Sequence, residues 1–464
     1  MKNTLSSKYF VDYLLIGCVG ICFALLFVIL NNQSLQYANE SAFIVVIFLV
    51  MSIAYYISNK KEGWDILSPV HIYFWFYACI FIFTPIALIL VGRTDCMGVD
   101  VMGGCYRATI AAMLSVIFFM IGYSKAKVAK EYKPIKELSM QNRKRSLKIA
   151  YLFFFLGLIV DLWVLRMQGR SLLYIFSLGY GDSYERLLGS HDINFEFVYN
   201  IHFAMMIPWL LICHFSQSKT LKIVLTFVMF TIFYAGGFRF IFYIMLLSYV
   251  IVYYRKKISR PQVSKILLVV LAVLVFSTFL GMQRGKLRTG EQLQMEATMD
   301  NNDIAYTLES NFNIYQPFYG VAEKYPMTYN YTLGRVMLGD AFILWIPRLV
   351  WPSKPRGDET NMSITMKNSI NASVIDQAAM AMPNVAPFYV DWGYVGVILF
   401  SFLLGYALKK TLKLFYSGNM LYIITYGILC GILIQYINRG AFVLLTVLLV
   451  FFLLPVFFLK KYFK

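Results

Sequence analysis

The sequence predicts an all-α protein that crosses a membrane many times. The chain has 464 residues, 59% of them hydrophobic, and it includes 40 Phe and 34 Tyr. This is more apolar surface than the core of a soluble protein of this length can bury. Continuous apolar runs approach the roughly 20 residues that an α-helix needs to cross a bilayer. A β-barrel would instead show alternating segments of about ten residues.

Twelve membrane spans can be drawn along the chain. The first, Val11 to Leu30, is too long for the apolar core of a cleavable signal peptide and lacks a small-residue cleavage site, so we expect it to remain as a signal anchor. The predicted spans are 11–30, 41–58, 69–92, 107–123, 147–165, 197–215, 222–236, 239–254, 266–282, 386–408, 419–436 and 440–459.

Lysine-rich connections orient these spans. Lysine and arginine in short loops prefer the cytoplasmic side of a membrane. With twelve spans, every lysine-rich connection falls on one side, which predicts that both termini are cytoplasmic. The connections are Lys60–Lys61, Lys125–Lys148, Arg255–Lys265, Lys409–Lys413 and the tail with Lys460 and Lys461.

The outer loops divide the chain into three parts. Residues 1–282 carry the first nine spans and a small outer loop at 166–196, residues 283–385 form a large outer loop, and residues 386–464 carry the last three spans. Two stretches of the large loop, NFNIYQPFYGVAEKY and RVMLGDAFILWIPRLVW, have apolar residues at near-helical spacing but are too short or too polar to span. They predict helices that lie on the outer surface.

The arginines are distributed against the orientation rule. In this topology 12 of the 16 arginines lie outside or at the outer ends of spans, together with 4 of the 26 lysines. Guanidinium stays charged and binds phosphate or carboxylate through two parallel hydrogen bonds. The outer arginines therefore indicate an acidic ligand. The inner lysines are explained by orientation and anionic lipid headgroups, so nucleic acid is not an expected partner.

Arg239 is the first candidate site residue. It lies in YAGGFRFIF, between two apolar runs with almost no loop between them. An arginine buried there is costly unless it is paired or solvated, and Gly236 and Gly237 would let a ligand approach closely. The alternative is an arginine that snorkels to the membrane surface.

A second constellation is IPRLVWPSKPRGDE, in which cations surround an indole. A phosphorylated sugar could place its charged end on guanidinium and an apolar sugar face on the ring. The alternative is an interfacial anchor, because Trp and Arg both favour the headgroup zone. The residues are Arg348, Trp351, Lys354 and Arg356.

Further arginines and several carboxylates complete the candidates. Arg439 stands at the outer junction of two spans, and Arg284 and Arg288 open the large loop, where a solvated stem is the alternative. A carboxylate near the membrane surface is suited to act as a general base when burial raises its pKa. Asp391, at the outer mouth of the tenth span, is preferred for this role, with a structural hydrogen bond as the alternative. The other acidic candidates are Asp340, Glu323 and Asp161.

Several kinds of chemistry are not indicated. The four histidines have no HxH or HExxH spacing, so a zinc site is not expected. A phosphate-binding glycine loop before a helix is absent from the sequence, which argues against nucleotide hydrolysis. Cys96 and Cys105 share one short outer loop, where disulfides persist, so they predict a bridge, with two free thiols as the alternative.

The motifs GGFRFIF, IPRLVWPSKPR, PNVAPFYVDWGYVGVILFSFLLG and NRGAF, in this order, resemble the Wzy-type polymerases of oligosaccharide repeat units, which include the O-antigen and enterobacterial common antigen polymerases. The similarity covers mainly residues 225–445. That family also has an Arg separated from a Gly by ten residues in its outer loops. Arg170 and Gly181 match this spacing, whereas the arginines of the large loop do not.

The resemblance implies a GT-C-like membrane glycosyltransferase of the bacterial inner membrane that works without metal or nucleotide. It would transfer a growing glycan from undecaprenyl diphosphate onto a new lipid-linked repeat unit at the periplasmic face, building an O-antigen, common antigen or capsule-type polysaccharide. Arg239, Arg439 and Arg348 would hold the donor diphosphate, and a carboxylate would deprotonate the acceptor. A chain-length-regulating membrane protein is a further partner of this kind of enzyme.

Two other classes of protein remain open from the sequence. A lipid-linked oligosaccharide flippase or another transporter would line an aqueous path with charges deep in several spans, and Asp161 is the one deep candidate. An O-antigen ligase-like transferase would share the arginines, but a histidine base is expected in its outer loop. Residues 283–385 contain no histidine.

Overall fold

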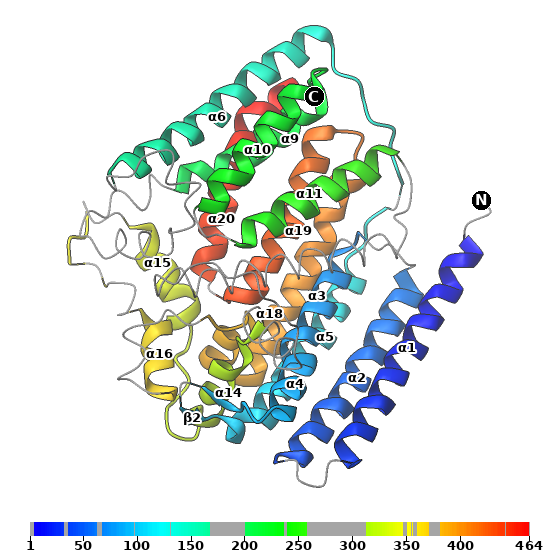
Figure 1. Cartoon of the computed structure of the whole chain (residues 1–464), viewed down its shortest axis with the longest axis vertical. Helices are drawn as coiled ribbons and strands as arrows, with labels where there is room; N and C mark the ends of the chain where they lie inside the picture. The colour runs from blue at the N-terminus through cyan, green and yellow to red at the C-terminus, as the bar shows by residue number, and fades with distance from the viewer. Residues whose placement is uncertain are drawn as a thin grey trace, which may run out of the picture.

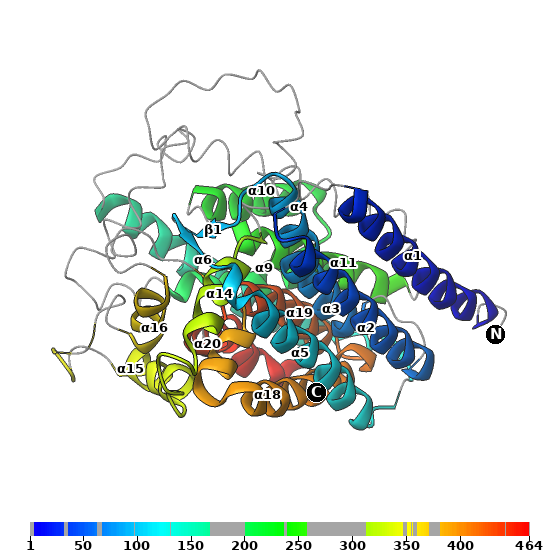
Figure 2. The same ribbon diagram turned by 90° about the horizontal axis from the view of Figure 1, so that it is seen from below.

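The structure is a computed structural model of the chain. It describes residues 4–31, 36–62, 67–96, 98–129, 131–167, 200–235, 239–257, 312–346, 350–353, 355, 360–370, 381–440 and 442–463. Long helices lie side by side, and short helices gather at the lower end in Figure 1. Figure 2 shows the molecule from that end.

The N-terminal half begins with a helical layer and a small hairpin. Strand β1 pairs with β2 antiparallel, in the register Asp95 to Asp100 and Cys96 to Val99. The elements are α1 (Thr4–Asn31), α2 (Ala38–Glu62), α3 (Pro69–Ala78), η1 (Cys79–Phe83), α4 (Thr84–Leu90), β1 (Asp95–Cys96), β2 (Val99–Asp100), η2 (Met102–Gly104) and α5 (Cys105–Lys125).

A second set of helices follows. It comprises α6 (Met140–Met167), η4 (Asn200–Met205), α9 (Met206–Phe215), α10 (Lys219–Ala235) and α11 (Arg239–Lys257). The C-terminal part comprises α14 (Tyr315–Lys324), η5 (Arg335–Gly339), α15 (Asp340–Trp345), α16 (Asn361–Ser369), α18 (Val385–Tyr416), α19 (Met420–Arg439), α20 (Phe442–Leu459) and η7 (Lys460–Tyr462).

Eight helical segments in the described part of the chain are long and apolar enough to cross a membrane. They coincide with eight of the twelve predicted spans. Three further predicted spans coincide with η4–α9, α10 and α11, which are not among those eight, and the predicted span 266–282 lies outside the described residues. The prediction of an all-α protein with many membrane helices is confirmed, while the number twelve stays a prediction.

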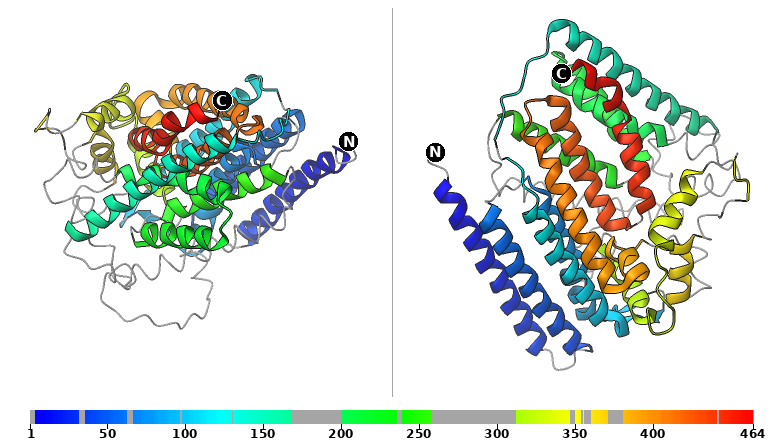
Figure 3. Two further views of the ribbon diagram at one scale, coloured as in Figure 1. Left: turned by 90° about the horizontal axis from the view of Figure 1, so that it is seen from above. Right: turned by 180° about the vertical axis from the view of Figure 1, so that it is seen from behind.

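The side chains pack in two apolar cores. One core joins α2, α3, α5, α14 and α18. The other joins α6, α9, α10, α11 and α20, and α19 contributes side chains to both. Seen from behind in Figure 3, α1 and α2 form a pair at one side of the bundle. Because α19 packs in both cores, it connects them and its position is fixed by contacts with each.

Two glycines bring α5 and α18 into backbone contact. A Cβ on Gly122 would lie 2.0 Å from the carbonyl oxygen of Phe402, and a Cβ on Gly405 would lie 2.0 Å from that of Phe119. Small residues allow such close helix packing in membranes, where the lipid gives little hydrophobic drive for helices to associate. This contact fixes α18, which carries part of the candidate site.

Helix α18 is broken near its N-terminus. Trp392 and Gly393 leave the helical conformation, and Gly393 has a φ of 61°, which favours glycine. The break frees two carbonyl groups, and the segment before η5 satisfies them: Thr332 N donates to Val390 O at 3.0 Å, and Leu333 N donates to Asp391 O at 3.0 Å. The segment before η5 is therefore hydrogen-bonded to the broken turn of α18, which follows it in sequence.

Three lysine-rich segments lie together at the end of the molecule away from the break in α18. Lys133 N donates to Tyr416 O at 3.1 Å, and Lys136 N donates to Gly418 O at 2.8 Å, so the connection after α5 runs along the turn between α18 and α19. Asn419 Nδ2 donates to Phe463 O at 2.6 Å, which joins the C-terminus to the same turn. These hydrogen bonds thus join three of the segments predicted to be cytoplasmic: the connection after α5, the turn between α18 and α19, and the C-terminus.

One predicted surface helix is in the interior. Helix α14 is covered on both faces, because η2, α5, α16 and α18 surround it, and Tyr315, Phe318 and Tyr319 are fully buried. The prediction that this stretch lies on the surface is wrong. The stretch that forms η5 and α15 does present apolar side chains at the surface, as predicted.

Candidate functional site

Helices α11 and α19 pack in an antiparallel pair through glycine. A Cβ on Gly431 would lie 2.7 Å from Cα of Ile244, and a Cβ on Gly427 would lie 3.0 Å from Cα of Ser248. A step of four residues toward the C-terminus of α19 therefore corresponds to a step of four residues toward the N-terminus of α11. Continued in this register, the start of α11 lies beside the last turn of α19.

This packing brings the backbones of Arg239 and Arg439 to the same end of the bundle. Arg239 is the first residue of α11, of which the structure describes the backbone here, and Arg439 is the last residue of α19, with an exposed side chain. Gly440 ends α19 in the left-handed conformation, with its N–H bonded to Tyr436 O at 2.9 Å. Two arginines distant in sequence thus stand on neighbouring helix ends.

The start of α18 adjoins the same place. Asn384 N donates to Ile437 O at 3.1 Å, and a Cβ on Gly440 would lie 2.5 Å from Met382 O. Helix α20 begins at Phe442, three residues after Arg439, and η5 and α15 pack on α20. The start of α11, the starts of α18 and α20, the end of α19 and the η5–α15 segment therefore form one candidate site, at the level of the α15 label in Figure 1.

Asp391 supports this site from inside. Its carboxylate is 0% exposed and accepts hydrogen bonds from Val336 N at 3.1 Å, Met337 N at 2.8 Å and the Thr332 hydroxyl. The carboxylate caps the N-terminal turn of η5, where unpaired N–H groups need an acceptor. Asp391 stands at the mouth of α18 as predicted, but this geometry favours a positioning role over the predicted role as general base.

Asp340 supports the other end of η5. Its carboxylate accepts from Asn361 N at 2.9 Å, Asn361 Nδ2 at 2.8 Å and Met362 N at 3.0 Å, and so it caps the first turn of α16. Thr360 also caps α16 by accepting from Ser363 N. Burial raises the pKa of Asp340, and the three hydrogen bonds oppose this rise without cancelling it.

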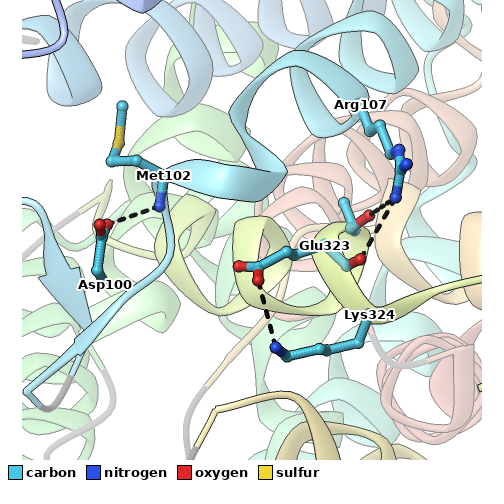
Figure 4. Close-up of polar contacts among 6 residues, drawn as sticks. Asp100, Met102, Arg107, Glu323 and Lys324 are labelled. Atoms are coloured by element: carbon cyan, nitrogen blue, oxygen red, sulfur yellow. Dashed lines mark hydrogen bonds and ion pairs between the residues drawn. The ribbon is translucent and has the colours of Figure 1, made fainter. Parts of the chain in front are cut away.

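Glu323 is the more accessible carboxylate. Its side chain is 34% exposed and its Oε1 lies 3.2 Å from Lys324 Nζ. Figure 4 shows Arg107 on α5 beside it, where Nη1 donates to Ala322 O at 3.4 Å and to Glu323 O at 3.3 Å. Arg107 therefore caps the C-terminus of α14, where the helix dipole favours a cation. We did not predict its contribution, and its only signal in the sequence is an arginine at the outer start of a span.

Tyrosines pack between α14 and the broken helix α18. Tyr389 donates to Tyr325 O at 3.2 Å, and its ring lies 5.3 Å from that of Tyr394 and 6.2 Å from that of Tyr331. Tyr394 donates to Arg107 O at 3.4 Å. Amphipathic rings of this kind offer both an apolar face and a hydroxyl group.

Most of the other predicted site residues lie outside the described part of the chain. Trp351 is half-buried, and its Nε1 donates to Ser353 Oγ at 3.1 Å. Arg348, Lys354, Arg356, Arg170, Arg284 and Arg288 lie outside the described residues. In the part of the chain that the structure describes, no group of three or more His, Cys, Asp or Glu side chains could hold a metal ion.

The predicted disulfide is not formed. Cys96 and Cys105 are both buried, free thiols. Cys105 Sγ lies 3.9 Å from Thr109 Oγ1, one turn along α5, and Cys96 is held in the hairpin opposite Val99. Burial raises the pKa of Cys96 to about 12, so the thiolate that forms disulfides is scarce.

Comparison with known proteins identifies the family. Residues 14–464 match the family described as O-antigen polysaccharide polymerase Wzy. No curated protein and no solved structure matches the chain. The match covers nearly the whole chain, including the broken α18 and the arginine-bearing ends of α11 and α19. The chain is thus a multi-pass membrane protein that belongs to the O-antigen polysaccharide polymerase Wzy family.

Proposed function

We propose that the protein polymerises undecaprenyl-diphosphate-linked oligosaccharide repeat units at the periplasmic face of the bacterial inner membrane. The observation that carries the proposal is that the backbones of Arg239 and Arg439 stand on neighbouring ends of two antiparallel helices, at the end of the bundle opposite the lysine-rich segments. Lysine-rich segments favour the cytoplasm. The arginines would then face the periplasm, where a lipid-borne diphosphate is accessible.

In the proposed reaction, an acceptor hydroxyl oxygen bonds to the anomeric carbon of the donor glycan. The bond from that carbon to the diphosphate oxygen breaks, and the diphosphate leaves with the bonding electrons. Guanidinium groups of Arg239, Arg439 and Arg348 would stabilise the charge that develops on the leaving group, an effect that often dominates catalysis. The products are undecaprenyl diphosphate and a glycan longer by one repeat unit.

The acceptor proton needs a base. Of the three carboxylates proposed from the sequence in this half of the chain, Asp391 and Asp340 are buried and each accepts hydrogen bonds from two backbone N–H groups. Glu323 is partly exposed, and it lies beside the tyrosines that would contact sugars. We therefore assign the proton transfer to Glu323, with Asp391 and Asp340 holding the frame of the site.

The substrate arrives with its own leaving group, so the reaction needs no nucleotide, and in this proposal guanidinium groups take the place of a metal ion in neutralising the diphosphate. Purified protein in liposomes should lengthen lipid-linked repeat units with EDTA present and nucleotide absent, giving a ladder of products on a gel. Abolition by chelator and restoration by one divalent ion would contradict the metal-free mechanism.

Arginine variants connect this activity to the site. Arg439→Lys keeps the charge but loses the planar fork, so we expect activity to fall by about tenfold or more. Arg239→Lys should behave alike, and Arg93→Lys, at an exposed outer position, serves as the control. In a strain lacking the gene, single repeat units should accumulate at the outer face. Accumulation at the inner face would instead indicate a flippase.

A further inference from the structure

The η5–α15 segment has exposed apolar side chains, in contrast to the buried helix α14. Leu338 is 43% exposed and Phe342 is 72% exposed. They are four residues apart, so they lie one above the other on one helix face. Leu333, which precedes η5, is 76% exposed. Leu338 and Phe342 form the apolar face of η5–α15, and Leu333 adds an exposed apolar side chain just before it.

A cation stands at the head of this face. Arg335 is the first residue of η5, and its side chain is exposed. In the described part of the chain, no carboxylate forms a salt bridge with it. The nearby Asp340 directs both carboxylate oxygens to Asn361 and Met362. The guanidinium of Arg335 is therefore available to an anion from outside the chain.

The backbone that carries Arg335 is held on both sides. Asp391 accepts from the N–H groups of Val336 and Met337, directly after Arg335. Asn361 Nδ2 donates to the carbonyl oxygen of Arg335 at 3.1 Å, and Asn361 is itself bound by Asp340. A binding group on a fixed backbone loses less entropy when it takes up a ligand.

The position of the segment points to a ligand from the bilayer. η5 packs on α18 and α20, and α15 packs on α20, two helices long and apolar enough to cross the membrane. Side chains of a helix lean toward its N-terminus, so Leu338 leans toward the turn that bears Arg335. The exposed side of this short segment thus offers a guanidinium, followed within one turn by hydrocarbon.

We propose that this face binds the lipid carrier of the substrate: Arg335 contacts the diphosphate, and Leu338 and Phe342 contact the first isoprene units of the chain. This inference rests on the proposed function and adds a binding residue outside the motifs that signalled the family. Arg335 would hold the diphosphate from the side of η5, while the arginines at the ends of α11 and α19 contact the same diphosphate and stabilise it as the leaving group.

Native mass spectrometry of the full-length protein in detergent, titrated with sugar-free undecaprenyl diphosphate, tests the assignment. Arg335→Gln should weaken binding by about tenfold or more, because it removes a charged hydrogen-bond donor. Arg335→Lys retains the charge at an exposed side chain, so the fold should be unchanged, and it should weaken binding by about threefold. Phe342→Ala should weaken it by about fivefold through lost apolar contact.

Two matched variants serve as controls. Arg93→Gln removes another exposed outer arginine, and Phe23→Ala removes a phenylalanine of α1 that is 69% exposed. Both should bind as the wild-type protein does. Phosphatidylglycerol and inorganic pyrophosphate are the competing probes. If the Arg335 and Phe342 variants lose phosphatidylglycerol binding to the same extent, the face is a general lipid contact and the proposal is overturned. The proposal is also overturned if pyrophosphate displaces undecaprenyl diphosphate at a concentration equal to that of the lipid.

The outcomes separate this inference from the proposed function. If the wild-type protein binds undecaprenyl diphosphate through Arg335 but does not lengthen repeat units, the binding site stands and the polymerase assignment fails. If the wild-type protein lengthens repeat units and Arg335→Gln and Phe342→Ala bind the lipid and lengthen glycans as well as it does, the polymerase assignment stands and the binding site is refuted.

Discussion

Asp391 shows how the position of a residue can follow from sequence while its surroundings do not. Its position near the start of a span follows from hydropathy. Its environment depends on Val336 and Met337, more than fifty residues earlier in the chain, and no local pattern reveals such a contact. The hydrogen bonds to buried N–H groups favour a positioning role, and the role of general base stays a prediction.

We expect Asp391→Asn to destabilise the protein. Hydrogen bonds to a charged acceptor contribute about 1.5 to 3 kcal/mol, and the amide places a donor where a second donor already stands. The melting temperature of the purified variant should fall, and the residual activity should keep the pH profile of the wild-type enzyme. A normal melting temperature together with a shifted pH profile would restore Asp391 as the base.

Asp340 provides a pH-dependent prediction. Burial raises its pKa in the folded protein above the ordinary value of 3.8, so the folded state binds this proton more tightly than the unfolded chain does. The stabilisation is therefore full below the ordinary pKa, declines as the pH rises toward the raised folded value, and is lost above it.

Asp340→Asn cannot titrate and isolates this effect. The melting temperature of the wild-type protein minus that of the variant should decrease as the pH rises from about 4 to about 7. Thermal unfolding monitored by fluorescence across this range measures the difference. A difference that grows with pH would mean that the folded protein lowers the pKa of Asp340.

At the scale of elements, hydropathy predicted the helices well because bilayer thickness imposes a simple length rule. It failed for α14, where apolar residues at helical spacing suggested an interfacial helix. The same spacing suits a helix covered by protein, and the surroundings come from η2, α5 and α18. The break at Trp392 and Gly393 was also missed, because the flanking residues continue the apolar run.

The contact between α5 and α18 should depend on its glycines. Gly405→Leu would place a side chain against the backbone of Phe119, where even a Cβ would lie 2.0 Å from a carbonyl oxygen. Overpacking commonly costs about 1 to 3 kcal/mol, and here the obstacle is backbone, so we expect the upper end. Gly17→Leu on α1, where no atom lies within 4 Å of the added Cβ, is the control. The assay is the melting temperature in detergent, and equal stability of both variants would argue against this packing.

At the scale of the whole molecule, the distribution of cations predicted which segments share an end. The structure joins the connection after α5, the turn between α18 and α19, and the C-terminus by hydrogen bonds. The composition of the candidate site was only partly predictable. Arg239 and Arg439 were found because they interrupt apolar sequence, whereas Arg107 and Arg335 became candidates only through their neighbours in space.

Labelling with a membrane-impermeant thiol reagent tests the topology. In a variant without native cysteines, a cysteine at Gly181 or Gly290 should react from the periplasmic side, because both positions fall in predicted outer loops. A cysteine at Ile135, beside the inner turn, should react only after the membrane is opened. Reaction of Ile135→Cys in intact cells would invert the orientation.

The bonds that Asp391 makes also bear on how far relatives of this protein can drift apart. The donors at Val336 and Met337 are main-chain amides, which every residue type except proline supplies. The bonds therefore require no particular side chain at these two positions, where the packing of the core alone limits the choice, provided that an acidic acceptor remains at 391. Relatives could therefore retain the same helix break while the residues around it are replaced by others that fill the same space.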